Sequence, residues 1–331
     1  MSSTEDLTAE KVKEFARKKG ADLVGIASID RFEGAPPHLH PAKTLLPTAK
    51  SVVVVAKRIP RGCYRGNLEG TNFTTYAFYG YFFQQHRYYM IRLDYEVARF
   101  LESYGYEAVP TQGLGLHFRI AAFAAGLGQI GWHNVFITPQ FGPRVRFGII
   151  ATEAELEPDP LFEGKLCDPE DCGYRCVYEC PNGAVPKNRK KTVNVAGKTI
   201  EFSDLDLTRC VPDCIRLTEH SPFIRREMER SPSLKEHINA LYRELAARPP
   251  SQLAPSLAMR RPPPLQPQPS PREIIDSLVD CYRMMKRHLG GPAYVFRGAT
   301  GCMEACIQYL EESGKVPRYV YPFRRREPWK L

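Results

Sequence analysis

Apolar residues recur at helical spacing in three stretches of the chain. Residues 8–20 carry an apolar face that starts after Thr8, a residue type that caps helix N-termini, and ends at Gly20. Residues 88–104 repeat this pattern, and residues 301–314 repeat it again up to a closing glycine. The pattern predicts one amphipathic helix in each stretch.

Shorter apolar stretches lie between these helices. Residues 21–28, 135–138 and 144–152 each have the length and the apolar content of a β-strand. Residues 51–57 contain four consecutive valines, which leave no polar face and predict a strand buried on both sides. The alternation predicts a layered α/β (α+β) domain in the first half of the chain.

The composition excludes several classes of protein. Of the 331 residues, 43% are hydrophobic and 25% are charged, as in ordinary globular proteins and unlike disordered or collagen-like chains. No window approaches about eighteen uninterrupted apolar residues, so no transmembrane helix is expected. The first eight residues have neither a basic nor an apolar segment of an export signal, so we expect a cytoplasmic protein.

Ten cysteines are the most informative part of the composition. Four of them form the run Cys167-x4-Cys172-x3-Cys176-x3-Cys180, which is followed by Pro181. A long chain without an export signal is not typical of a disulfide framework, and the run lacks the separated knuckles or histidine partners of structural zinc. Its last step matches the bacterial ferredoxin motif C-x2-C-x2-C-x3-C-P, although the first two gaps are wider. The run therefore predicts a [4Fe–4S] cluster, with zinc as the alternative.

More distant cysteines can complete the ligand set. In two-cluster ferredoxins the cysteine before proline ligates the other cluster, so further ligands must come from far along the chain. Two later cysteines stand four residues apart on one face of the helix at 301–314. We expect two [4Fe–4S] clusters, or at least one, with metal ligands drawn from Cys167, Cys172, Cys176, Cys180, Cys210, Cys214, Cys302 and Cys306. Cys63 and Cys281 are interpreted as lone thiols.

The stretch that precedes residues 135–138 is rich in glycine. Its three glycines have the spacing of the dinucleotide-binding fingerprint, but they precede a strand instead of opening a helix after one, so NAD binding is not expected. Glycines also remove side chains where another group approaches the backbone. The candidate cofactor-binding residues are Gly126, Gly128, Gly131, His133 and Asn134. Residues 76–89 are rich in aromatic side chains, which suit a flat cofactor surface or ordinary core packing equally well.

Four segments of the chain resemble one known protein family. They are residues 40–55, 95–110, 125–152 and 167–181, the last followed by Arg209-Cys210. In this order they resemble the cobalamin-dependent iron–sulfur reductases, which include the epoxyqueuosine reductases and the reductive dehalogenases. The resemblance implies that electrons pass through iron–sulfur clusters to the cobalt of a corrinoid and then to a substrate.

The same resemblance implies two domains. A nitroreductase-like domain over residues 1–158 would hold the corrinoid, and a ferredoxin-like domain over residues 159–331 would hold two [4Fe–4S] clusters. Residues 248–272 contain nine prolines and interrupt the second domain as an extended insertion.

The chain departs from the family where the epoxyqueuosine reductases carry out catalysis. Their catalytic aspartate falls at Gln112, which cannot donate a proton, and the second cysteine motif is reduced to Cys302-x3-Cys306. The chain also ends about 25 residues after that motif, which leaves no room for the family's tRNA-binding tail. We therefore expect a substrate other than epoxyqueuosine. His117 is the candidate catalytic proton donor because histidine titrates near neutral pH; a tyrosine of residues 76–89, or a structural role for this histidine, is the alternative.

The chain is basic, with a net charge of +9 and a pI near 9.0. Short arginine and lysine clusters account for much of the excess, for example residues 189–191 and 324–326. Such clusters can steer an acidic electron donor or simply form a solvated face. Because aromatic residues are not interleaved with them, nucleic-acid binding is not expected.

These observations leave three functional interpretations. The first is a corrinoid-dependent iron–sulfur reductase that takes electrons from flavodoxin or ferredoxin and reduces a small organic substrate. The second is an iron–sulfur electron-transfer or redox-activator protein without a substrate of its own. The third is a structural iron–sulfur or zinc protein that contacts nucleic acid through its basic clusters.

Overall fold

A computed structural model describes most of the first two-thirds of the chain and one segment near its end. The described residues are 6–68, 75–76, 79–80, 89–111, 116–180, 183–206, 210, 236 and 300–323. Gln112, Cys214, Cys281, residues 248–272 and most of the aromatic-rich residues 76–89 lie outside these described residues.

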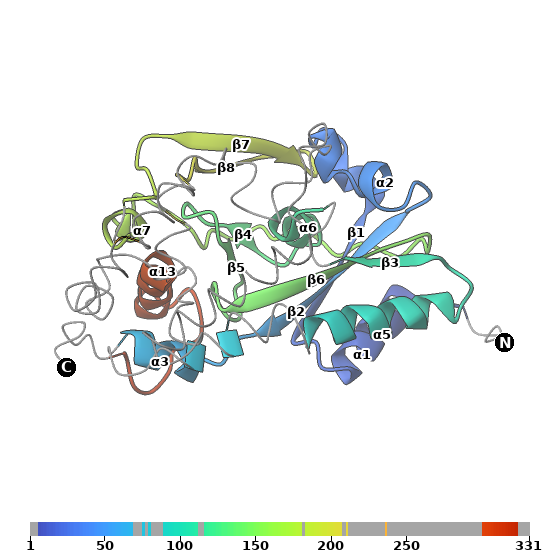
Figure 1. Cartoon of the computed structure of the whole chain (residues 1–331), viewed down its shortest axis with the longest axis horizontal. Coiled ribbons are helices and arrows are strands. Elements are labelled where there is room, and N and C mark those ends of the chain that lie inside the picture. Colours follow the sequence, from blue (N-terminus) through green and yellow to red (C-terminus); the bar gives the residue numbers. More distant parts are fainter. Residues whose placement is uncertain are drawn as a thin grey trace.

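A four-stranded antiparallel sheet forms the centre of the described structure (Figure 1). In spatial order its strands are β1 (Leu23–Ser28), β2 (Ser51–Arg58), β6 (Val145–Thr152) and β3 (Ala108–Thr111). In the middle of the sheet, Val54 of β2 lies opposite Gly25 on one side and Ile149 on the other. Helices packed on an antiparallel sheet give a mixed fold of the α+β kind.

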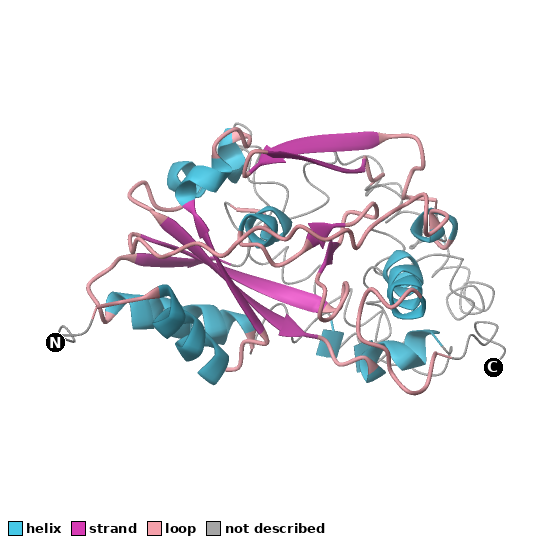
Figure 2. Ribbon diagram, turned by 180° about the vertical axis from the view of Figure 1, so that it is seen from behind, coloured by secondary structure: helices cyan, strands magenta, loops and turns pink. Residues whose placement is uncertain are grey.

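Both faces of this sheet are covered (Figures 1 and 2). Helices α1 (Ala9–Lys18) and α5 (Met90–Glu102) pack on one face, and helix α6 (Phe118–Ala124) packs on the other. Successive side chains of a strand point to opposite faces. Val53 and Val55 therefore pack in the apolar cluster under α1 and α5, and Val52 and Val54 pack in the apolar cluster under α6. This explains why β2 has no polar face.

The remaining elements surround this core. They are η1 (Ile29–Phe32), η2 (Pro37–Leu39), α2 (Pro41–Thr44), α3 (Gly62–Leu68), β4 (Gln129–Ile130), β5 (Phe136–Ile137), α7 (Arg175–Tyr178), β7 (Lys190–Val195), β8 (Lys198–Ser203) and α13 (Thr300–Glu312). Helix α13 contacts both α7 and α3 at one end of the molecule (Figure 1). Among the described residues, no helix combines the length and the apolar character that crossing a membrane requires.

The structure confirms the predicted helices and strands and adds a hairpin. Each of the three predicted helices is present, with ends that differ by one or two residues. Strands β7 and β8 were not predicted, although the turn between them consists of Ala196 and Gly197, both with positive φ, as hairpin turns require. The basic cluster at residues 189–191 therefore leads into an exposed edge of this hairpin.

The predicted boundary between residues 158 and 159 stays a prediction. The hairpin contributes Val193, Val195 and Ile200 to the apolar cluster that lies beneath α6. Asp159 is also bound to the first half, because its carboxylate accepts hydrogen bonds from the Ile26 N–H at 2.8 Å and from Lys13 at 2.5 Å. The two halves are therefore packed together at this point.

Candidate metal centre

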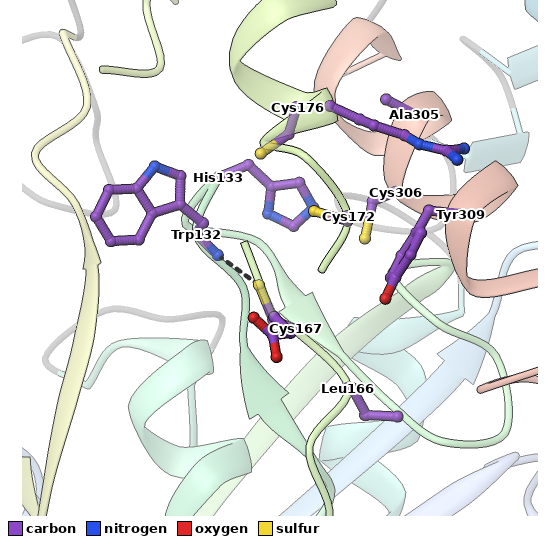
Figure 3. Close-up of a pocket in the computed structure, with 11 residues that line it drawn as sticks. Trp132, His133, Leu166, Cys167, Cys172, Cys176, Ala305, Cys306 and Tyr309 are labelled. Atoms are coloured by element: carbon purple, nitrogen blue, oxygen red, sulfur yellow. Dashed lines mark hydrogen bonds between the residues drawn. The ribbon is translucent and has the colours of Figure 1, made fainter. Parts of the chain in front are cut away.

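Three cysteines of the dense run and one distant cysteine line one pocket (Figure 3). Cys167 and Cys172 come from the loop before α7, Cys176 lies in α7, and Cys306 lies in α13. We call these four residues the pocket cysteines. The structure thus brings a residue of the last predicted helix to the dense cysteine run.

The loop that carries the first pocket cysteine is held by side-chain and backbone hydrogen bonds. The amide oxygen of Gln129, in β4, accepts the backbone N–H groups of Leu166 at 2.9 Å and of Cys167 at 3.1 Å. The backbone N–H of Trp132 donates to the Cys167 sulfur at 3.2 Å, as Figure 3 shows. Such N–H donors stabilise a thiolate over a thiol.

Helix α13 is fixed by a buried ion pair. Arg61 and Glu311 are 6% and 9% exposed, and their two parallel hydrogen bonds are both 2.7 Å long. The guanidinium of Arg61 also lies 3.6 Å from the ring centroid of Phe323. Breaking a buried pair of this kind leaves an uncompensated charge, so its geometry strongly constrains where α13 sits.

Three other cysteines form a second group, which consists of Cys180, Cys210 and Cys302. Burial raises the pKa of the Cys302 thiol well above its usual range, and the thiols of Cys210 and Cys180 raise it further. The Cys180 sulfur accepts the backbone N–H of Ala184 at 3.2 Å. Cys176 also raises the pKa of Cys302, and Cys302 raises that of Cys306. Cys180, Cys210 and Cys302, which we call the second cysteine group, therefore lie close to the pocket cysteines.

The pocket cysteines also raise one another's pKa. Burial raises the pKa of Cys167 to about 11, and burial together with the thiols of Cys167 and Cys172 raises the pKa of Cys176 to about 12. Burial and the other three pocket thiols likewise raise the pKa of Cys306 well above its usual range. Several thiolates so close together are unfavourable by themselves, and bound iron cations remove that penalty.

The donor set fits a [4Fe–4S] cluster. Four cysteines, from one loop, the short helix α7 that follows it and the distant helix α13, are the ligands that such a cluster requires. Within the described ranges, no three histidine, cysteine, aspartate or glutamate side chains meet as the ligands of a single ion. All eight described cysteines are free of disulfide bonds. Cys63 is not among the residues that line the pocket, and it packs in an apolar cluster with Ile59, Tyr64 and Met303.

The glycine-rich stretch is packed against protein. A Cβ on Gly126 would lie 2.0 Å from the carbonyl oxygen of Pro160, and a Cβ on Gly128 would lie 2.1 Å from that of Ile137. Both glycines also have positive φ, at 73° and 150°. Contacts with other segments of the same chain therefore account for these two glycines, and the described residues do not show that the glycines cradle a corrinoid.

The aromatic-rich residues are only partly described. Tyr76 is fully buried, and its ring centroid lies 4.7 Å from that of Tyr64, so this residue packs in the core. Tyr79 and Tyr89 are more than half exposed. Core packing therefore accounts for Tyr76. It does not account for Tyr79 and Tyr89, which are exposed.

His117 is the N-cap of α6 and is in contact with the half-buried Arg119. The Nδ1 of His117 accepts the backbone N–H of Arg119 at 3.3 Å. The guanidinium of Arg119 lies 2.6 Å from the Nε2 of His117. Arg119 also donates to the carbonyl oxygen of Asn134. Burial and the charge of Arg119 hold the pKa of His117 well below its usual range. At neutral pH this histidine is uncharged, which favours the structural alternative over proton donation.

His133 lies in the pocket with the cysteines (Figure 3). It is 3% exposed, and burial together with the charge of Arg119 lowers its pKa to about 4. Its neighbour Asn134 has a φ of 62° and closes a tight turn by donating its N–H to the carbonyl oxygen of Gly131 at 2.8 Å. The turn therefore directs His133 towards the cysteines.

Several residues of the site were not identified from the sequence. Gln129 and Arg119 carried a weak signal, since each lies within a few residues of a candidate already chosen. Arg61 and Glu311 carried none, because the partners are 250 positions apart.

The sequence comparisons find relatives among the reductive dehalogenases. No protein-family model matches the chain. The tetrachloroethene reductive dehalogenase of Sulfurospirillum multivorans is 38% identical over 100 residues, which are 29% of this chain and 19% of that protein. The enzyme of Dehalobacter restrictus is 35% identical over 111 residues, which are 31% of this chain and again 19% of that protein. The chain is a distant homologue of the reductive dehalogenases. The similarity spans about a fifth of the length of these curated relatives.

Comparisons with solved structures find matches that have low sequence identity to the chain. A reductive dehalogenase whose structure suggests a mechanism for B12-dependent dehalogenation has a TM-score of 0.49 and 18% identity, covering 78% of this chain and 37% of that one. The epoxyqueuosine reductase of Bacillus subtilis has a TM-score of 0.43 and 18% identity, covering 92% of this chain and 82% of that one.

The geometry of Gly126 predicts that Gly126→Ala destabilises the protein by roughly 3 kcal/mol or more, because the new Cβ meets the Pro160 carbonyl and the backbone has positive φ. Gly105→Ala is the matched control, since Gly105 has a φ of 90° and open space around it. We expect about 1–2 kcal/mol for this control. Urea unfolding measures both values, and equal losses would contradict the packing interpretation.

The buried pair predicts a contrast between two adjacent glutamates of α13. Glu311→Gln leaves Arg61 buried without its counter-ion, and we expect a loss of about 3 kcal/mol in the free energy of unfolding. Glu312→Gln removes an exposed pair with Arg175 and should cost less than about 1 kcal/mol. Similar losses in the two variants would show that the Arg61–Glu311 pair does not position α13.

Proposed function

We propose that the protein is an iron–sulfur reductase whose clusters pass electrons to a second cofactor and then to a small organic substrate. The observation that carries this proposal is the meeting of Cys306, from α13, with three cysteines of the run at residues 167–176. When bound, a [4Fe–4S] cluster supplies one-electron transfer at a potential that its protein surroundings set.

The two cysteine groups suggest how the ligands are shared. The pocket cysteines would hold one cluster, and Cys180, Cys210 and Cys302, with Cys214 as the fourth ligand, would hold the other. Cys180 precedes proline and lies with distant cysteines, while Cys306 joins the early run, which is the exchange typical of two-cluster ferredoxins. This arrangement supports a ferredoxin-like domain in the second half.

The chain's own residues have identifiable roles in this proposal. The N–H groups of Trp132 and Ala184 donate to cysteine sulfurs, one in each group, and so favour the thiolate form. Ile137, Leu166 and Leu310 pack beside the pocket cysteines and exclude water from them. Exclusion of water strengthens every electrostatic interaction at the site.

The second cofactor is proposed to be a corrinoid held by the first half of the chain, in a nitroreductase-like domain. Support comes from the distant homology to the tetrachloroethene reductive dehalogenases and from the sequence resemblance, not from the glycine-rich stretch. The substrate is proposed to be a small organic molecule other than epoxyqueuosine, and the electron donor a flavodoxin or ferredoxin. Because protein fills the space beside Gly126 and Gly128, an electron-transfer protein without its own substrate is the second candidate.

The cluster assignment predicts the iron content of cysteine variants. Anaerobically reconstituted protein should contain about eight irons and eight sulfides per chain. Cys306→Ala and Cys302→Ala should each retain about four irons, their double variant should retain almost none, and Cys63→Ala should match the parent protein. Iron and sulfide assays with EPR of the reduced samples measure this. A double variant that keeps four irons would show that both cysteines serve one cluster, and zinc in place of iron would overturn the proposal.

The corrinoid proposal predicts stoichiometric cobalamin binding. Iron-loaded protein incubated with cobalamin should retain about one corrinoid per chain through gel filtration and should show a base-off spectrum. Free cobalamin on the same column is the control. Intact clusters with no retained corrinoid would reject the corrinoid and favour the electron-transfer candidate.

A further inference from the structure

One ring nitrogen of His133 is buried without a hydrogen-bond partner among the described residues. This atom is Nε2, and the residue is 3% exposed. The ring lines the same pocket as the four pocket cysteines, and Figure 3 shows it among their labelled side chains. A buried polar atom without a partner is costly, so its surroundings indicate what it is meant to bind.

The other ring nitrogen determines where the proton is. Nδ1 of His133 accepts the backbone N–H of Val135 at 3.2 Å, so Nδ1 carries no proton. In a neutral imidazole the proton must then be on Nε2, which makes Nε2 a hydrogen-bond donor. His133 therefore presents a buried N–H donor to a pocket lined with cysteine sulfurs.

The orientation of the ring is determined by the backbone around it. A Cβ on Gly131 would lie 2.7 Å from Cε1 of His133, so the glycine leaves the space that the ring occupies. The N–H of Gly131 donates to the carbonyl oxygen of Val135 at 2.8 Å, which closes the turn around the histidine. The donor is thus held in place before any ligand binds.

The acceptors that line this pocket are the four cysteine sulfurs, the Tyr309 hydroxyl and the carboxylate of Asp168, which already accepts hydrogen bonds from Lys165 and from the Asp171 N–H. A thiol sulfur is a weak acceptor, whereas the thiolates and sulfides of an iron–sulfur cluster are anionic and accept strongly. Hydrogen bonds to cluster sulfurs stabilise the added negative charge of the reduced state and so raise the reduction potential.

We propose that the Nε2–H of His133 donates a hydrogen bond to a sulfur atom of the cluster held by the pocket cysteines and raises the reduction potential of that cluster. This inference rests on the proposed iron–sulfur function. His133 then acts only through the cluster to which it donates. It is neither a metal ligand nor a proton donor to the substrate.

The test compares three variants of the reconstituted protein. His133→Phe keeps the ring and removes the donor, and His133→Gln places an amide N–H near the position of Nε2. His40→Phe is the matched control, because His40 is also 3% exposed and has a buried ring nitrogen without a partner, but it lies between η2 and α2, away from α7 and α13 (Figure 1). Redox titration followed by EPR measures the potential of each cluster, and iron assays measure cluster content.

We expect His133→Phe to lower the potential of one cluster by the equivalent of about tenfold in its reduction equilibrium, or about 59 mV for one electron. His133→Gln should restore most of this shift, and His40→Phe should cause none. In the parent protein, pulsed EPR should detect an exchangeable proton coupled to the reduced cluster, and this coupling should be missing in His133→Phe.

Three results would overturn the inference, and they are distinguishable from a failure of the proposed function. Unchanged potentials in His133→Phe, with full iron content, would reject the hydrogen bond and leave the iron–sulfur proposal standing. Loss of iron from both His133→Phe and His133→Gln would make the histidine a ligand or a structural residue instead. A parent protein that binds no iron under any reconstitution condition would overturn both proposals.

Discussion

The packing of α13 against the loop and helix that carry the cysteine run is the contact on which the site depends. Met303 and Ile307 of α13 enter the apolar cluster beside α3, and Leu310 enters the cluster around Ile137. These three residues form one stripe of the helix, and Cys306 lies on the neighbouring stripe. Burial of the apolar stripe therefore turns the cysteine towards the pocket, and the ion pair at Arg61 prevents the helix from rotating or sliding.

Two arginines contribute positive charge to the part of the molecule that holds the cysteines and α13. Arg61 is buried and paired with a carboxylate of α13. The half-buried Arg119 contacts His117, and burial lowers its pKa to about 10, with Cys210 opposing that change. A cation at this position compensates the negative charge that thiolates and cluster sulfides bring to the second cysteine group. The basic character of the chain therefore has a buried component that composition alone does not reveal.

Local patterns in the sequence predicted the elements and the kind of site, but not the contacts that assemble them. The cysteine spacing predicted thiolate ligands, and the periodicity predicted the helix that carries Cys306, because each signal consists of residues that lie close together in the sequence. The partition of the cysteines into two groups, and the pairing of Arg61 with a residue 250 positions away, depend on tertiary packing and have no local signal. Cys214, Gln112 and residues 248–272 lie outside the described residues, so predictions about them stay untested.

The glycine-rich stretch shows that one local signal is compatible with more than one partner. A glycine indicates that something approaches the backbone, and the signal is the same whether a cofactor or another part of the chain approaches. Here the backbone of Pro160 approaches Gly126 and the backbone of Ile137 approaches Gly128, so both glycines pack against other segments of the chain. Trp132 and His133, which follow the last glycine of the stretch, face the pocket cysteines with a backbone donor and a ring donor. Close packing of the glycines holds both donors rigidly, and rigid donors favour the charged state of a sulfur site without reorganising when an electron arrives. The described contacts of this stretch are therefore with the chain itself and with the candidate metal centre, and its part in holding a cofactor stays a prediction.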